Sequence, residues 1–164
     1  KRTLLGLISG VLYSQNGTVK SYKKNFGYIG ATPLIFTGTI RENILYGNED
    51  KISDDEIMVY LKRFEVFKES SRYNLDEIID NKSLSSGQMQ KISFIRALIG
   101  DVDILLLDES TANLDQKSRE LIFDILKKQK ISIINSTHDP ESFENIDHRL
   151  KIEIKDDKRK LIFD

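Results

Sequence analysis

A short apolar run that ends in two adjacent carboxylates constrains this chain more than any other feature. Residues Ile104–Leu107 are all Ile or Leu, and they are followed directly by Asp108 and Glu109. A strand without polar alternation is buried on both faces, which is typical of a parallel sheet covered by helices. We therefore predict an α/β fold in which Asp108 and Glu109 lie at the carboxyl edge of the sheet, where ligands of open α/β sheets bind.

The rest of the chain carries helical and strand patterns in the order that such a sheet requires. Gln116–Lys130 has the amphipathic pattern of a helix, and Ile131–Asn135 predicts a second buried strand. A strand, a helix of about 15 residues and a parallel strand form a right-handed crossover unit. The other predicted elements are helices at Thr3–Val11, Ser53–Phe64, Glu65–Ser70, Gly87–Ile99 and Glu141–Asn145, strands at Thr18–Tyr22, Phe26–Ile29, Arg149–Lys155 and Lys160–Phe163, and a loop at Tyr73–Lys82. Ser53 and Glu56 have the spacing of a capping box, and the last two strands are expected to form an exposed hairpin.

The composition argues against several classes of protein. The 164 residues contain no cysteine, which excludes a disulfide framework, a thiolate zinc site and a cysteine nucleophile. The 25 basic and 26 acidic residues leave a net charge of -1, and this balance argues against nucleic acid as a partner. Residues Thr3–Val19 carry no charge, but their apolar part, Leu4–Tyr13, has only about half of the roughly 20 residues that a membrane-spanning helix needs.

The turn Leu84–Gln88 precedes a predicted helix and could bind phosphate. Free amides at a helix N-terminus and the positive end of the helix dipole attract anions, and Ser85 adds a hydroxyl. The same residues would also suit ordinary N-capping by Ser85, because serine is a common cap. For this turn taken alone, capping is the favoured interpretation.

Three further positions could take part in phosphate chemistry. One of the carboxylates Asp108 and Glu109 could hold Mg²⁺ through water while the other polarises an attacking water, although acidic loop residues after a strand would look the same. His138 follows the second buried strand and could donate to a phosphate, but a lone histidine is more often structural. Lys1–Thr3 opens a predicted helix with the lysine and hydroxyl that end a P-loop.

In this order and spacing, the elements resemble the nucleotide-binding domain of the ATP-binding cassette (ABC) family. Leu84–Gln88 resembles the family's signature, LSGGQ, and Ile104–Glu109 resembles its Walker B motif with the catalytic glutamate. Thr111–Asp115 resembles the D-loop, and His138 resembles the switch histidine. Thr37–Ile44 matches a segment typical of exporter-type cassettes, which argues against an importer or a chromosome-maintenance ATPase.

The resemblance implies a RecA-like P-loop NTPase core with a mostly parallel sheet, formed by residues 1–36 and 100–164. It implies an inserted helical subdomain at residues 37–99, which carries the signature. It also implies ATP and Mg²⁺ as cofactors, and a second nucleotide-binding domain that packs head to tail with this one around two ATP molecules. The expected function is ATP hydrolysis at the cytoplasmic face of a membrane, coupled by dimer closure to the transmembrane domains of a transporter.

The implied site residues divide between the two ATP molecules. For the domain's own ATP they are Lys1 for the β- and γ-phosphates, Arg2 beside it, Thr3 for the α-phosphate, Asp108 for Mg²⁺ through water, Glu109 as general base and His138 for the γ-phosphate. For the partner's ATP they are Ser85, Ser86, Gly87 and Gln88, and Asp115 would communicate across the dimer.

Several positions depart from the family's pattern. The family has Ser or Thr after the Walker A lysine as a Mg²⁺ ligand, whereas this chain has Arg2, which cannot ligate a metal but can pair with phosphate. Ala31 stands where the family has a glutamine, and Ser86 replaces the first glycine of the signature. These departures support an alternative function, a non-catalytic domain that lends its signature to a competent partner. Because the sequence begins at Lys1, we also expect a fragment that lacks the Walker A glycines.

Overall fold

The computed structural model describes residues 1–21, 25–48, 52–67, 73–138, 140, 146–155 and 158–163. The helices are α1 (Arg2–Ile8), α2 (Ile40–Leu45), α3 (Asp54–Arg63), α4 (Ser86–Ile99) and α5 (Gln116–Lys127). The strands are β1 (Phe26–Gly30), β2 (Gly38–Thr39), β3 (Ile78–Ile79), β4 (Ile104–Asp108), β5 (Ser132–Ser136), β6 (Leu150–Lys155) and β7 (Lys158–Phe163).

Three parallel strands in the order β1-β4-β5 form the central sheet. Phe26 of β1 lies opposite Ile104 of β4, which in turn lies opposite Ser132 of β5. Residues 105–107 in the middle strand are fully buried, as a strand without polar alternation requires. The predicted α/β fold with a parallel sheet is thus confirmed, and the carboxyl ends of all three strands meet at one edge.

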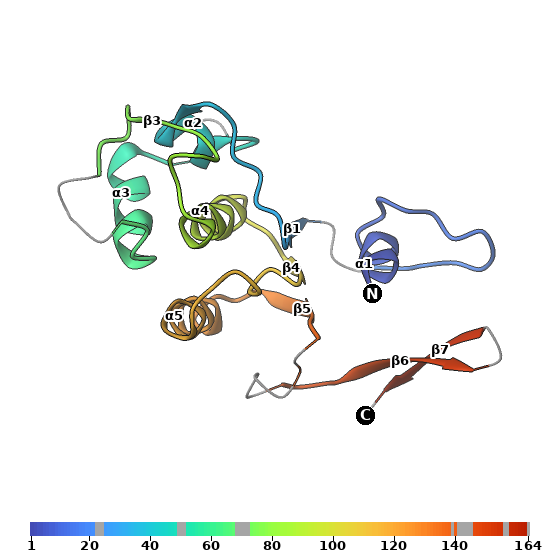
Figure 1. The fold of residues 1–164 in the computed structure, drawn as a ribbon. Coiled ribbons are helices and arrows are strands. Elements are labelled where there is room, and N and C mark those ends of the chain that lie inside the picture. The colour runs from blue at the N-terminus through green and yellow to red at the C-terminus, as the bar shows by residue number, and fades with distance from the viewer. Residues whose placement is uncertain are drawn as a thin grey trace.

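The helices lie on both sides of this sheet. Figure 1 shows α2, α3 and α4 together on one side of the strands and α1 on the other. Apolar side chains from α2, α3 and α4 pack with β4 and α5 in one buried cluster, which includes Ile44, Ile57, Leu61, Ile92, Ile95, Leu105, Leu107 and Ile122. Burial of each such side chain contributes about 1.5–3 kcal/mol. This shared core packs α4 against β1, which pairs with the strand that ends in Asp108.

Capping boxes begin α2, α3 and α4. The hydroxyl of Thr39 accepts a hydrogen bond from the backbone N–H of Glu42, whose carboxylate accepts one in return from the Thr39 N–H. Ser53 and Glu56 repeat the arrangement at the start of α3, where the sequence predicts it. Each box satisfies two backbone donors that the first turn of a helix leaves unpaired.

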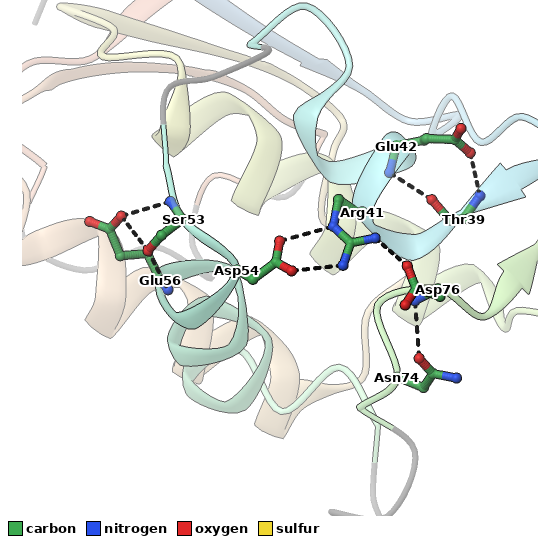
Figure 2. A network of polar contacts seen from close by, with 8 residues as sticks. All are labelled: Thr39, Arg41, Glu42, Ser53, Asp54, Glu56, Asn74 and Asp76. Atoms are coloured by element: carbon green, nitrogen blue, oxygen red, sulfur yellow. Dashed lines mark hydrogen bonds and ion pairs between the residues drawn. The ribbon is translucent and has the colours of Figure 1, made fainter.

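Arg41 of α2 ties three segments together. Its Nε and Nη2 atoms donate to the two carboxylate oxygens of Asp54, the first residue of α3, at 2.9 and 2.7 Å (Figure 2). Its Nη1 atom donates to Asp76, in the loop before β3. The two carboxylates raise the pKa of Arg41 above its ordinary value. A bidentate guanidinium fixes the orientation of both helices more tightly than a single bond would.

Two predictions for the N-terminal part need correction. The strand predicted at Thr18–Tyr22 is wrong for residues 18–21, which are exposed and have no strand assignment. A short strand forms only where a neighbouring strand takes up its backbone hydrogen bonds, and none of the described strands pairs with these residues. The helix predicted at Thr3–Val11 ends earlier, at Ile8, and is followed by Gly10 with a φ of 76°.

Other boundaries also differ. Glu65 has a φ of 48°, so the chain leaves the helical conformation after α3 and the helix predicted at Glu65–Ser70 is wrong for residues 65–67. Strand β3 lies inside the loop predicted at Tyr73–Lys82, and α5 ends three residues before its predicted end. Strand β5 is exposed or half-buried and not buried as predicted, because it lies at the edge of the described sheet. The hairpin of β6 and β7 forms as predicted. The helix predicted at Glu141–Asn145 lies outside the described residues.

Among the described residues, no helix is both long enough and apolar enough to span a membrane.

Candidate functional site

Several predicted site residues meet at the carboxyl edge of the central sheet. Asp108 is the last residue of β4 and is almost fully buried, and Glu109 follows it. The backbone N–H of Glu109 donates to the carbonyl of Ser136, the last residue of β5, at 2.9 Å. Glu109 has a φ of 56°. This left-handed conformation costs a residue with a side chain about 1–3 kcal/mol, and such strain is frequent at functional sites.

The carboxylate of Asp108 is held by two donors on other elements. Arg2 Nε donates to Asp108 Oδ2 at 2.7 Å, and the Tyr28 hydroxyl donates to the same oxygen at 2.9 Å. Burial alone would raise the pKa of Asp108. The two hydrogen bonds and the charge of Arg2 outweigh burial and lower this pKa below its ordinary value of 3.8. Asp108 is therefore an ionised carboxylate, paired with a cation from α1.

The side chain of Glu109 contacts His138, which follows β5. His138 Nε2 lies 2.8 Å from Glu109 Oε1, and its Nδ1 lies 3.5 Å from Lys1 Nζ. Lys1 Nζ also donates to the backbone carbonyl of Thr137. The arrangement suits a neutral imidazole that carries its proton on Nε2, donates to Glu109 and accepts from Lys1. The fold thus brings together a lysine, a histidine and a glutamate from three separate parts of the chain.

The turn at the start of α4 is an N-cap. Ser85 Oγ accepts from the N–H of Gln88 at 3.2 Å, and the N–H of Ser85 donates to Gln88 Oε1 at 2.8 Å. Ser85 and Ser86 are exposed, and Gly87 and Gln88 are half-buried. A Cβ added to Gly87 would meet nothing closer than 4.0 Å. The capping interpretation is therefore confirmed, and it leaves the serine side chains at the surface.

Asp115 and Thr3 lie outside this cluster of contacts. Asp115 is the N-cap of α5 and accepts from the N–H of Ser118 at 2.7 Å. The hydrogen bonds from Ser118 lower the pKa of Asp115 below its ordinary value. Thr3 is exposed in the first turn of α1. The cap role of Asp115 is compatible with a second role at a surface, because its side chain is exposed.

Sequence reasoning missed two side chains that help to shape the site. Tyr28 in β1 reaches Asp108, and Asn113 Nδ2 donates to the carbonyl of Ala31 at 2.9 Å. One signal for Tyr28 was present in the sequence. Tyr28 lies one residue before the end of the strand predicted at Phe26–Ile29, at the same sheet edge as Asp108. Asn113 gave no such signal, because only the folded chain brings residues 31 and 113 together.

The described residues do not fit a bound Mg²⁺ ion in the arrangement that the resemblance implies. Mg²⁺ prefers oxygen ligands in a near-octahedral set. Arg2 supplies no oxygen, and its guanidinium already contacts the carboxylate of Asp108. No group of three or more His, Cys, Asp or Glu side chains within the described ranges is arranged to hold a metal. The edge instead offers cationic donors, Lys1 and Arg2, which suit phosphate.

Comparison with known proteins identifies the family. The model of a family described as "ABC transporter" matches residues 1–112. The "ATP-dependent permease MDL1" of Candida albicans is 37% identical over 135 residues, which are 77% of this chain and 20% of that protein. The "Alpha-factor-transporting ATPase" of Saccharomyces cerevisiae is 36% identical over 142 residues, or 78% of this chain and 11% of that protein.

A bacterial relative gives the same result. The "Glutathione/L-cysteine transport system ATP-binding/permease protein CydD" of Haemophilus influenzae is 32% identical over 137 residues, which cover 81% of this chain and 23% of that protein. The chain thus spans a quarter or less of the length of these three relatives. The chain belongs to the ABC transporter family, as an ATP-binding domain of the exporter type.

Proposed function

We propose that this chain binds and hydrolyses ATP and that it couples this reaction to transport across a membrane. One observation carries the proposal: Lys1, Glu109 and His138 converge beside Asp108 at the carboxyl edge of the sheet. In this proposal, residues 1–36 and 100–164 form the core, and residues 37–99 form a helical subdomain. The packing of α2, α3 and α4 around one another supports that division.

Hydrolysis in such a site depends mainly on positioning and charge stabilisation. Lys1 would contact the β- and γ-phosphates, and Thr3 would contact the α-phosphate. Glu109 would accept a proton from the attacking water. The hydrogen bond between His138 and Glu109 Oε1 supports these roles, because it holds the carboxylate in one orientation and His138 also approaches Lys1. His138 would turn to the γ-phosphate once nucleotide is present.

A second copy or a related domain would complete the site. Ser85, Ser86, Gly87 and Gln88 would bind the partner's ATP in a head-to-tail pair, and Asp115 would contact the partner. The exposure of both serines and of Asp115 supports such a role. Splitting the phosphate donors between two domains makes ATP binding favour closure. Closure would then move the transmembrane domains, with this domain at the cytoplasmic face of the membrane.

A second candidate function follows from the contact between Arg2 and Asp108. In that case the domain binds nucleotide without turning it over and lends its signature turn to a competent partner. The hydrogen bond of 2.7 Å from Arg2 favours this candidate, because it occupies the carboxylate that would otherwise hold Mg²⁺ through water. Mg²⁺ therefore has no assigned role in this domain's own site in either proposal.

The substitution Glu109→Gln in the assembled transporter distinguishes the two candidates. If Glu109 is the base, nucleotide affinity stays near that of the wild type, and ATP turnover falls by the roughly 10²–10⁴-fold that general-base catalysis contributes. Glu153→Gln, on the exposed β6–β7 hairpin, serves as the matched control and should leave nucleotide affinity and ATP turnover unchanged. Turnover that is unaffected by Glu109→Gln, with ATP still bound, would favour the non-catalytic candidate.

A further inference from the structure

The oxygen atom Asp108 Oδ2 accepts hydrogen bonds from two side chains that lie on other elements. Arg2 Nε and the Tyr28 hydroxyl lie 2.7 and 2.9 Å from it. The Asp108 side chain is only 3% exposed, whereas the Arg2 side chain is 78% exposed. The buried carboxylate is thus neutralised by a cation whose outer part faces solvent at the sheet edge.

The geometry of a guanidinium matters here. Arginine presents five N–H donors in a rigid planar fork, and Nε uses only one of them for Asp108. The remaining donors belong to an exposed group beside Lys1, whose Nζ lies at the same edge through its contacts with Thr137 and His138. Two cations from adjacent residues suit a polyphosphate, because guanidinium pairs with phosphate in a bidentate manner and lysine adds a second positive charge.

From these contacts we infer that Arg2 takes the place of a divalent cation. Its guanidinium bridges Asp108 and the phosphates of a nucleoside triphosphate, and this site binds nucleotide without Mg²⁺. The inference rests on the proposed nucleotide-binding function. It goes further by naming the group that neutralises the phosphates. A divalent cation beside Asp108 Oδ2 would lie close to the Arg2 guanidinium, which is unfavourable because the two positive charges repel each other.

Tyr28 has a supporting role in this arrangement. Its hydroxyl donates to the same oxygen as Arg2 and so favours the carboxylate orientation that faces Arg2. Burial and the contact with Asp108 raise the pKa of Tyr28 above its ordinary value of 10.0, so the hydroxyl remains a donor at neutral pH. Tyr28 is therefore a positioning residue that acts through Asp108.

The test measures nucleotide binding to this domain within the assembled transporter. A photoreactive ATP analogue is crosslinked in the presence of Mg²⁺ or of a chelator, and the label is quantified on this domain separately from its partner. In the wild type we expect labelling with chelator to stay within about twofold of labelling with Mg²⁺. In Arg2→Ser we expect labelling with chelator to fall by roughly ten- to a hundredfold, which corresponds to the loss of a charged hydrogen bond. Mg²⁺ should restore the labelling of Arg2→Ser, since the serine hydroxyl can serve as a metal ligand.

The controls separate a local effect from a general one. Arg159→Ser removes an exposed arginine on the β6–β7 hairpin and should behave as the wild type. Arg2→Lys keeps the charge but loses the planar fork, so labelling with chelator should lie between those of the wild type and Arg2→Ser. Counting bound Mn²⁺ per labelled domain by electron paramagnetic resonance gives a second readout, with metal expected in Arg2→Ser and not in the wild type.

Two results would overturn the inference in distinguishable ways. Wild-type labelling that falls tenfold or more with chelator would show that this site needs a metal, while leaving the proposed ATP binding intact. If neither the wild type nor Arg2→Ser is labelled under either condition, the proposed nucleotide binding fails, and the inference fails with it.

Discussion

His138 Nε2 lies 2.8 Å from Glu109 Oε1, although the two residues belong to the ends of different strands. The parallel register of β4 and β5 accounts for this contact, because it aligns Asp108 with Ser136 and brings the residues that follow each strand to the same edge. The contact links the proposed base to the residue that also approaches Lys1. Glu109 and His138 should therefore act as a unit.

The first prediction concerns that unit. His138→Ala should lower ATP turnover, because Glu109 loses the donor that orients it. The double substitution of Glu109→Gln with His138→Ala should cost little more than the larger single effect, since residues that act together are strongly non-additive. Steady-state ATP turnover of the wild type, both single variants and the double variant measures the coupling. Effects that simply multiply would show that the two side chains work independently.

The second prediction concerns the cap of α4. Ser85→Ala removes the hydroxyl that accepts from Gln88 N–H, so the domain should lose about 1 kcal/mol of unfolding free energy. Ser93→Ala, within the same helix, is the matched control. Its hydroxyl only donates back to the carbonyl of Met89, a bond that adds little to helix stability, so stability should change by less than about 0.5 kcal/mol. Urea-induced unfolding followed by circular dichroism measures both. Equal effects of the two substitutions would argue against a stabilising cap at Ser85.

The third prediction concerns acid stability. The hydrogen bonds from Arg41 lower the pKa of Asp54 below its ordinary value of 3.8. A carboxylate with a depressed folded-state pKa stabilises the fold above its unfolded-state pKa, and this contribution is lost as the pH falls through the folded-state value. The wild type should therefore lose stability below about pH 4, and Asp54→Asn should lose less over the same interval.

Urea midpoints at pH 7 and pH 3 for the wild type and Asp54→Asn provide the measurement. The other acidic groups are common to both proteins, so the difference between the two pH dependences isolates Asp54. Arg41→Ala is the control, because it removes the partner of Asp54. In a protein that carries Arg41→Ala, adding Asp54→Asn should change the pH dependence of stability less than it does in the wild type. An identical pH dependence in the wild type and Asp54→Asn would contradict a stabilising ion pair.

The sequence alone determined the features that depend on neighbouring residues. The apolar run at 104–107 predicted the buried parallel strand, and the order of Ser53 and Glu56 predicted a capping box. Both predictions hold because burial on two faces and capping are local consequences of side-chain type and spacing. The family resemblance was likewise carried by short continuous motifs, and the comparisons confirm it.

The tertiary structure decided everything that needs a partner from elsewhere in the chain. The strand predicted at Thr18–Tyr22 has the right residue types, but no described strand offers its residues 18–21 a ladder of hydrogen bonds. The pairing of Arg2 with Asp108 joins residues that lie 106 positions apart, and Asn113 reaches Ala31 across 82. No local pattern encodes such contacts, because they arise only when the parallel register of the sheet brings separate strand ends to one edge.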